Sequence, residues 1–388
     1  MIILQIILWF LIALIFHTYV LYPLILSIFG STKKHNIPEK SDYTPDVCII
    51  MSLFNEESVI KDKIESILKS DYPIDKIKLI IGSDNSTDQT NKIVQEYADK
   101  YEFITFVPFS TRQGKSNVIN AMIDKADGDI LILSDANVMF DNNTIKEIVK
   151  PFIDKKIGLV DTRMTNTGLK KEGISIQEKS YISREVMIKH NEGKLWGTMM
   201  GPFGGCFAIR RELYSPVPIN FLVDDFYICM KVLEKGYKSV NNVDAIVLED
   251  VSNNLSDEFR RKIRIATGDF QNLWEFKKLL WPPFTGLSFS FLSHKILRWL
   301  TPLFMIFSYG LNLLLAFYYD FYLYMFIAYN FIYILLITDF LLKKIKIHNV
   351  FLRFITHFMS MNLALLIGMI KAMKGVKTNV WKPTKRNQ

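Results

Sequence analysis

Apolar residues are concentrated toward the two ends of this 388-residue sequence, with a long stretch of mixed composition between them. Residues 2–30 are almost uncharged, and about 20 helical residues suffice to cross the hydrocarbon of a bilayer. The region 286–373 contains three further apolar stretches, at 296–319, 322–342 and 350–373. This distribution predicts a multi-pass membrane protein in which a folded domain lies between an N-terminal transmembrane helix, 1–30, and a C-terminal membrane region.

Basic residues beside the apolar stretches predict the orientation of the chain. Lys33, Lys34 and Lys40 follow the first stretch, so the positive-inside rule predicts that the domain after the 31–44 linker is cytoplasmic, at the cell inner membrane. No basic segment precedes this stretch, and we therefore expect a retained helix rather than a cleaved signal peptide. The formal net charge of +8 comes largely from Lys and Arg around the apolar stretches and in the basic tail, 374–388, which indicates membrane lipids and not nucleic acid as the anionic partner.

The last apolar stretch differs from the others because it carries a polar stripe. Arg353, His357 and Ser360 fall at i, i+4 and i+7, which is one side of a helix. A helix lying in the membrane interface fits this pattern, so we favour three transmembrane spans plus one interfacial helix. Four spans are the alternative.

The central segment, 45–285, alternates short β-branched runs with charged stretches of helical period. The predicted strands are 47–52, 78–83, 103–107 and 129–133, and the predicted helices are 57–70, 87–100 and 114–126. This alternation predicts an α/β domain with a Rossmann-like, mostly parallel sheet, whose ligands bind at the carboxyl ends of the strands.

Polar side chains follow three of the predicted strands, at 52–56, 83–88 and 134–137. Neither a GxGxxG nor a GxxxxGK[ST] loop accompanies them to bind phosphates through backbone groups. Carboxylates at the ligand edge of the sheet therefore predict a site in which a divalent cation holds the phosphates.

Six motifs carry a resemblance to a known family. They are Asn55-Glu56, Ser83-Asp84-x-Ser86-x-Asp88, Arg112-x-Gly114-Lys115, Asp135-Ala136-Asn137, Gly204-Gly205 before Phe207-Ala208-Ile209-Arg210, and Asp224-Asp225. Over residues 45–271 the sequence resembles family 2 glycosyltransferases, in particular membrane-bound members related to cellulose, hyaluronan and poly-N-acetylglucosamine synthases. The resemblance implies a catalytic domain of the GT-A fold.

The resemblance assigns one group of residues to a nucleotide-sugar donor: Asn55, Glu56, Asp84, Lys115, Asp135 and Arg264. Asp84 is expected to accept the imide N–H of uracil, and Lys115 to meet the nucleotide or its diphosphate. Asp135 and Asn137 stand where the family has its DxD pair, so Asp135 is expected to bind Mg²⁺ or Mn²⁺ that bridges the diphosphate. Asn137 departs from the second Asp of that pair and offers a neutral ligand.

The same resemblance assigns the catalytic and acceptor residues. Asp225 is the expected base that removes the proton of the acceptor hydroxyl in an inverting transfer, and Asp224 is the neighbouring acid that raises its pKa. Gly204 and Gly205 are expected to bring backbone close to the acceptor, because glycine lacks a β-carbon.

Two later segments bear on processivity. Processive relatives carry Gln-x-x-Arg-Trp, whereas here Arg261 stands for Gln and Ile265 for Trp, and Arg264 keeps the Arg that can neutralise the leaving diphosphate. The missing Trp argues against processive elongation. Trp381, Thr384 and Arg386 resemble a gating or diphosphate-binding segment of related synthases. This role requires a cytoplasmic C terminus.

The expected function is transfer of a sugar from a nucleotide-sugar, a UDP-sugar by preference, to a lipid-linked or glycan acceptor in cell-surface polysaccharide biosynthesis, with other assembly proteins as reasonable partners. The first alternative is a processive synthase that also exports its product. A nucleotidyltransferase would need a Gly-rich basic loop after the first strand, which 53–56 does not provide. A further alternative is a non-catalytic receptor or transporter subunit. Metal-dependent binding of a nucleotide would distinguish an enzyme from such a subunit.

Overall fold

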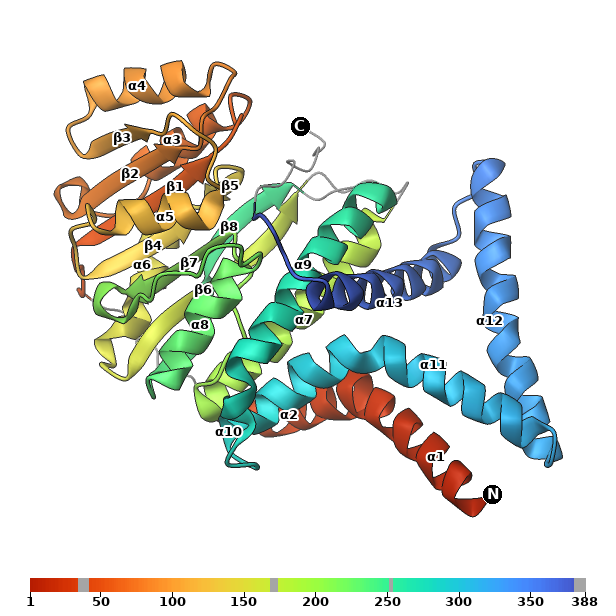
Figure 1. Ribbon diagram of the computed structural model, residues 1–388. Coiled ribbons are helices and arrows are strands. Elements are labelled where there is room, and N and C mark those ends of the chain that lie inside the picture. Colours follow the sequence, from red (N-terminus) through yellow and green to blue (C-terminus); the bar gives the residue numbers. More distant parts are fainter. Residues whose placement is uncertain (34–41, 168–173, 251–253, 380–388) are drawn as a thin grey trace.

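The structure, a computed structural model, describes residues 1–33, 42–167, 174–250 and 254–379. An α/β domain stands beside a group of long apolar helices (Figure 1). The strands of its sheet are β1 (Val47–Leu53), β2 (Ile77–Ser83), β3 (Ile104–Pro108), β4 (Ile130–Ser134), β5 (Val138–Phe140), β6 (Ile157–Thr167), β7 (Cys206–Arg210) and β8 (Lys238–Asp250). The helices of this domain are α3 (Ile60–Leu68), α4 (Thr90–Lys100), α5 (Lys115–Ile123), α6 (Thr144–Val149), α7 (Ser175–Trp196), α8 (Asp224–Glu234) and α9 (Leu255–Phe276).

The strand order across the sheet is β3-β2-β1-β4-β7-β6-β8-β5. β1, β2, β3 and β4 form a parallel half-sheet, and with α3, α4 and α5 they confirm the strands and helices predicted from the sequence. β7 runs antiparallel to both β4 and β6, and β5 runs antiparallel to β8. β6 pairs with β8 in parallel, so four of the seven strand pairings are parallel. The mostly parallel sheet predicted from the sequence is thus confirmed, with β7 and β5 as antiparallel members that were not predicted. The parallel half places the ends of β1, β2 and β4 at one edge.

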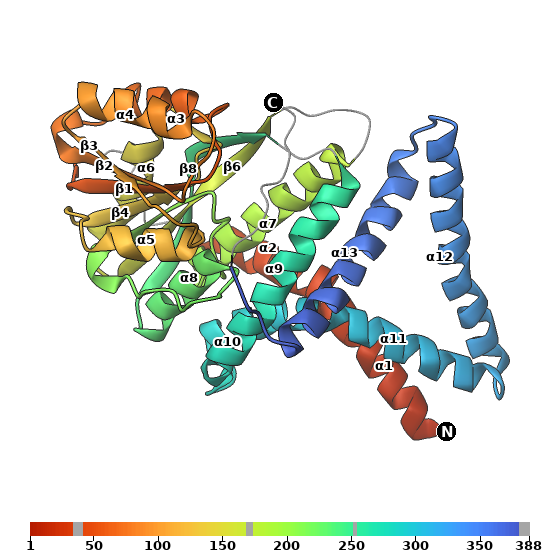
Figure 2. The same ribbon diagram turned by 45° about the horizontal axis from the view of Figure 1, so that its top comes forward.

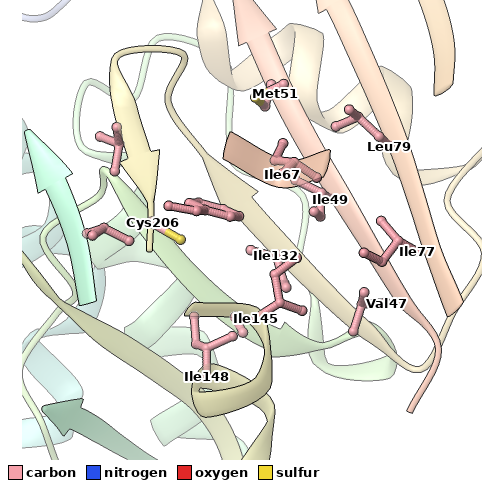
Figure 3. Packing of buried hydrophobic residues seen from close by; sticks show 14 of the residues in the cluster. Val47, Ile49, Met51, Ile67, Ile77, Leu79, Ile132, Ile145, Ile148 and Cys206 are labelled. Atoms are coloured by element: carbon pink, nitrogen blue, oxygen red, sulfur yellow. The ribbon is translucent and has the colours of Figure 1, made fainter. Parts of the chain in front are cut away.

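Alternate residues of the central strands supply two cores, one on each face of the sheet. Val47, Ile49 and Met51 of β1 are buried against α3, α4 and α6 (Figure 3), whereas Cys48 and Ile50 are buried against α5 and α8 on the opposite face. Because both faces are covered, β1 reads as a continuous apolar run, and burying each large aliphatic side chain contributes about 1.5–3 kcal/mol. This packing fixes the strand ends at which the polar clusters lie.

Four helices of the described chain are long and apolar enough to cross a membrane, judged by length and composition: Ile2–Thr32, Gly286–Ala316, Asp320–Lys344 and Val350–Met373. In Figure 1 they comprise α1 (Ile2–Phe16) continuing into α2 (Tyr22–Thr32), α10 (Gly286–Ser290) continuing into α11 (Leu297–Ala316), α12 (Asp320–Lys344) and α13 (Val350–Met373). The second of these helices begins at Gly286, earlier than the start at 296 that the sequence predicted. A capping box at Thr285 begins the helix there.

Two residues of the polar stripe of α13 have charged partners inside the protein. Arg353 Nε lies 3.3 Å from Asp339 of α12, and His357 Nε2 lies 2.6 Å from Glu178 of α7. The stripe that favoured an interfacial helix thus has protein partners. How many of the four helices cross the bilayer stays a prediction.

Helices α7 and α9 lie between the sheet and the apolar helices, and both views show α13 crossing α9 (Figures 1 and 2). Each is 22 residues long, and α9 carries its apolar side toward α13 and α8. Through these two helices, the edge of the sheet that carries the polar clusters faces the apolar helices.

Candidate active site

A single cavity of about 900 Å³ opens at the carboxyl ends of β1, β2 and β4 and extends toward the apolar helices. Every described residue that the sequence assigned to the site lines it: Asn55, Glu56, Asp84, Lys115, Asp135, Asn137, Gly204, Gly205, Asp224, Asp225 and Arg264. Trp381, Thr384 and Arg386 lie outside the described residues, so their expected role stays a prediction. The structure brings together side chains that are up to 209 positions apart, from Asn55 to Arg264.

Asp84 shapes the loop that leads into α5. Its two carboxylate oxygens accept hydrogen bonds from the backbone N–H groups of Gln113, at 2.6 Å, and Gly114, at 2.9 Å. Gly114 has φ +89°, a conformation that favours glycine. An ionised carboxylate has about four lone-pair sites, so Asp84 keeps capacity to accept from a nucleobase as well. Its expected role as base reader therefore fits its position, but part of its capacity serves the loop.

Asn55 ties the end of β1 to the end of β2. Its backbone N–H donates to Ser86 Oγ at 3.1 Å, and its side-chain Oδ1 accepts from the backbone N–H of Thr87 at 2.8 Å. Asn55 has φ 54°, a left-handed conformation that Asn tolerates better than most residues. Next to it, the backbone N–H of Glu56 donates to Thr90 Oγ1 at 2.8 Å. These bonds hold two polar clusters at one end of the cavity.

Lys115 is the central cation of the site. Its Nζ lies 2.7 Å from Asp135 Oδ1 and 4.0 Å from Asp224 Oδ2. Burial lowers the pKa of Lys115, but the Asp135 and Asp224 carboxylates outweigh it and raise the pKa above the ordinary value. Lys115 is therefore a permanent positive charge, placed where an anionic diphosphate would meet the carboxylates.

The residues around Asp135 fit a metal ion that is shared with a ligand. Among the described residues no three His, Cys, Asp or Glu side chains gather as a metal cage. Mg²⁺ commonly takes only one or two protein carboxylates together with substrate phosphates, and Asp135 supplies one such carboxylate, partly exposed to the cavity. Asn137 donates through Nδ2 to Glu249 Oε1 at 3.1 Å, which leaves its amide oxygen as the atom able to ligate.

The turn formed by residues 135–137 is supported by a buried lysine that the sequence pattern did not single out. Lys63 of α3 is fully buried, and its Nζ donates to Ser134 Oγ at 2.9 Å and to the carbonyl oxygen of Val138 at 2.5 Å. Burial lowers its pKa to about 7. Lys63 thus braces both sides of the 135–137 turn. The signal in the sequence was a lysine on the same helical face as the buried Ile60 and Ile64.

Asp225 combines burial with a neighbouring acid. It lies with Asp224 in the first turn of α8. Burial first, and then the Asp224 charge, raise the pKa of Asp225 to about 6, although Lys115 opposes them. A carboxylate with this pKa is ionised at neutral pH and is a better base than an ordinary Asp.

The two glycines fill different roles in the geometry. A β-carbon on Gly204, whose φ is +78°, would lie 2.4 Å from Asp225 Oδ2. Gly204 is therefore required for the backbone to approach the Asp224–Asp225 pair. On Gly205 a β-carbon would meet Met164 and Val138, and its carbonyl oxygen accepts from the backbone N–H of Asp135 at 2.9 Å. Gly205 thus holds the 135–137 turn.

The basic residues of α9 reach the cavity. Arg264 Nη1 donates to the carbonyl oxygen of Leu222 at 3.1 Å, just before the Asp224 pair. Arg261 lies 3.5 Å from Glu258, and Ile265 also lines the cavity at the position where processive relatives have Trp. Arg264 is thus placed on the same wall as Asp224 and Asp225.

Helix α7, which the sequence analysis left unassigned, carries three buried glutamates seven residues apart: Glu178, Glu185 and Glu192. Seven residues are close to two helical turns, so the three share one face. Glu178 pairs with His357 of α13, Glu185 with Lys295 and Arg298 of the second apolar helix, and Glu192 accepts from the Tyr22 hydroxyl of α2 at 2.7 Å. The spacing was readable in the sequence, but the distant partners were not.

Comparison with known proteins agrees with this geometry. The family model "Glycosyl transferase family 2" matches residues 48–217. A probable glycosyltransferase of Bacillus subtilis, YdaM, is 27% identical over 255 residues, covering 61% of this chain and 59% of the relative. A β-monoglucosyldiacylglycerol synthase of Nostoc is 26% identical over 192 residues, covering 49% and 41%. The poly-β-1,6-N-acetyl-D-glucosamine synthase of Staphylococcus epidermidis is 26% identical over 161 residues, covering 38% of each.

A solved structure extends the likeness to nearly the whole fold. The mannosyltransferase PcManGT from Pyrobaculum calidifontis, in complex with GDP-Man and Mn²⁺, superposes with a TM-score of 0.71 at 21% identity, covering 95% of this chain and 99% of that one. The chain matches 59% or less of the length of the curated relatives named above. The motifs and these matches show a family 2 glycosyltransferase domain over residues 48–217, and the mixed sheet and the solved structure show that the catalytic domain has the GT-A fold.

Proposed function

We propose that this protein is a membrane-bound enzyme that transfers a sugar from a nucleotide-sugar to a hydroxyl group of a lipid-linked or glycan acceptor. The observation that carries the proposal is the juxtaposition, in one cavity, of the Lys115–Asp135 pair with the Asp225 carboxylate. The first pair suits a diphosphate, and Asp225 suits a hydroxyl nucleophile, so the cavity accommodates both halves of a transfer reaction.

The donor occupies the strand-end side of the cavity. Asp84 and Asn55 lie at the nucleoside, while Lys115 and Arg264 stabilise the negative charge of the diphosphate. Asp135 and the amide oxygen of Asn137 would hold a divalent cation, Mg²⁺ or Mn²⁺, which would supply further positive charge at the diphosphate. The presence of Mn²⁺ and GDP-Man in the PcManGT complex supports a metal and a nucleotide-sugar. The preference for a UDP-sugar rests on the motif resemblance.

The transfer itself uses Asp225. Its ionised carboxylate accepts the proton of the acceptor hydroxyl while the hydroxyl oxygen forms a bond to the anomeric carbon. The bond from that carbon to the diphosphate oxygen breaks, and the electron pair leaves with the nucleoside diphosphate. Attack from the face opposite the leaving group inverts the anomeric configuration. A positioned base typically contributes about 10²–10⁴-fold to such a step.

Transfer of one sugar or a few is preferred over processive synthesis with export. Ile265 lines the cavity at the position where processive relatives carry Trp, so the aromatic platform of that motif is missing. We further propose that residues 1–30 anchor the enzyme in the cell inner membrane, that the 45–285 domain is cytoplasmic, and that 286–373 returns through the bilayer. The excess of Lys after the first and third apolar helices supports this orientation.

The direct test is release of nucleoside diphosphate by detergent-purified protein incubated with a panel of UDP- and GDP-sugars and Mn²⁺ or Mg²⁺. Turnover of one donor, abolished by Asp135→Ala and by Asp225→Asn but retained in Asp244→Asn, is expected. Asp244 is an exposed carboxylate on β8, outside the cavity, and is therefore a matched control. No turnover of any donor by folded protein supplied with membrane lipids would overturn the proposal.

A further inference from the structure

The cavity does not end at the sugar-transfer residues. Beyond Asp225 it continues along α9 to α13 and to the start of the second apolar helix. Its walls there are Tyr19, Trp299, Phe354, Phe358, Met361 and Leu365. The Tyr19 and Phe358 rings meet edge to face at 5.4 Å. The α13 side chains here are mostly apolar, and His357 and Asn362 are the polar ones. This end of the cavity is therefore mainly apolar and bounded by helices that could cross a membrane, which suits a hydrocarbon chain better than a hydrated glycan.

Positive charge gathers where this apolar end meets the rest of the cavity. Lys295 Nζ and Arg298 Nη1 share the Glu185 carboxylate, at 2.9 and 2.7 Å, so one acid faces two cations. Arg184 donates to the carbonyl oxygen of Tyr19, and in the described part of the chain no carboxylate lies within ion-pair distance of it. The buried Nε–H of Arg298 also lacks a hydrogen-bond partner among the described residues. The cluster Arg184–Lys295–Arg298 thus has donors and charge left for an anion.

The position of this cluster relative to Asp225 limits what the anion can be. Lys295 and Arg298 lie on Glu185 of α7, and Arg184 lies on the Tyr19 carbonyl. Asp225 instead lies beside Gly204 and Asp224, in the first turn of α8. An anion bound by the cluster is therefore separated from the base. A phosphate that was itself the nucleophile would be ionised at neutral pH and would need no base, whereas a hydroxyl group needs one. The attacking hydroxyl must then belong to a group that reaches from the cluster to Asp225.

We propose that the Arg184–Lys295–Arg298 cluster binds the phosphate of a membrane lipid whose head group is a sugar or polyol joined through that phosphate. The hydrocarbon chain of this lipid lies between α13 and the helix that contains Tyr19, and its head group presents a hydroxyl to Asp225. The inference rests on the proposed function, because it names the acceptor class of that same reaction. A bare lipid phosphate occupies the cluster but does not accept a sugar.

Binding of lipid phosphate can be measured without any donor. The full chain in detergent micelles is titrated with radiolabelled farnesyl diphosphate and with farnesyl glucoside, which has the same tail and no phosphate. Farnesyl diphosphate is expected to bind at least about tenfold more tightly, because charge-assisted hydrogen bonds are formed. Arg184→Gln should weaken its binding about tenfold and Arg184→Lys less. Arg260→Gln, a change of the same charge on an exposed residue outside the cavity, should leave it unchanged.

Equal binding of the two farnesyl compounds, or equal effects of Arg184→Gln and Arg260→Gln, would overturn the inference. Product analysis with the active donor gives a second decision: a sugar found joined directly to farnesyl diphosphate would show that the phosphate itself is the nucleophile. Hydrolysis of the donor, in which water takes the place of the lipid acceptor and nucleoside diphosphate is released, reports on the transferase reaction alone. Its failure is therefore distinguishable from a failure of lipid binding.

Discussion

The two ends of the cavity are built by different physical means. At the end where we propose that the donor binds, here called the donor end, the side chains follow adjacent strands, and the parallel pairing of β1 with β2 and β4 brings them to one edge. At the membrane end, charged side chains of α7 meet partners far along the chain, as in the Glu178–His357 pair, 179 residues apart, and the Glu185–Arg298 pair, 113 apart. The donor end therefore depends on sheet topology, and the membrane end on packing of helices through buried ion pairs.

The largest expected effect is on kcat, and it tests whether Asp225 is the general base that acts between the donor end and the membrane end. Asp225→Asn removes the proton acceptor with almost no change in volume, so we expect kcat to fall by about 10³-fold, within the range for loss of a general base. Initial rates of nucleoside diphosphate release measure it, and donor binding by equilibrium titration should change little. A drop in donor affinity as large as the drop in kcat would instead assign Asp225 to the donor end.

The second effect concerns the stability of the membrane end. Glu185 is buried and faces Lys295, Arg298 and His294, so Glu185→Gln leaves buried cations without their acid. We expect a loss of about 3 kcal/mol, as when one partner of a buried pair is removed, seen as a lower Tm of the detergent-purified protein.

Glu275→Gln is the matched control for that substitution. Its side chain is 41% exposed and lies 3.4 Å from Lys231, so its removal should cost less than about 1 kcal/mol. Equal Tm values for the two variants would mean that the α7 ion pairs do not hold the membrane end together.

The same contrast explains what the sequence could reveal. The position of Asp84 and Asp135 at one edge of the sheet could be predicted, because polar residues directly after β-branched runs indicate strand ends and parallel topology gathers such ends. Lys63, Glu185 and Glu192 were missed because helical period shows which residues share a face but not what that face meets. The antiparallel β7 was missed for a related reason: its direction is set by pairing with β4 and β6, which no local pattern records.

A smaller effect distinguishes backbone strain at a glycine from crowding of the Asp224–Asp225 pair. Gly204 and Gly236 both have positive φ, +78° and +82°, but a β-carbon would lie 2.4 Å from Asp225 Oδ2 at Gly204 and would meet nothing within 4 Å at Gly236. Each change to Ala should cost about 1 kcal/mol of stability. Only Gly204→Ala should also lower kcat, by about tenfold, through displacement of Asp225. A similar loss of kcat in Gly236→Ala would show that strain alone is responsible.

The smallest effect is a shift in pH dependence, which measures how strongly the charge at the donor end changes the pKa of Asp225. With the pKa of Asp225 raised to about 6, the base is protonated at lower pH, so kcat/KM should rise with pH through about 6 and then level off. Lys115 lowers that pKa, and Lys115→Gln should therefore move the rising limb upward by about 1 pH unit, apart from its effect on donor binding. The exposed Lys92→Gln on α4 should leave the limb in place. A limb that moves downward in Lys115→Gln would mean that another group, and not the Asp225 carboxylate, titrates in the rate.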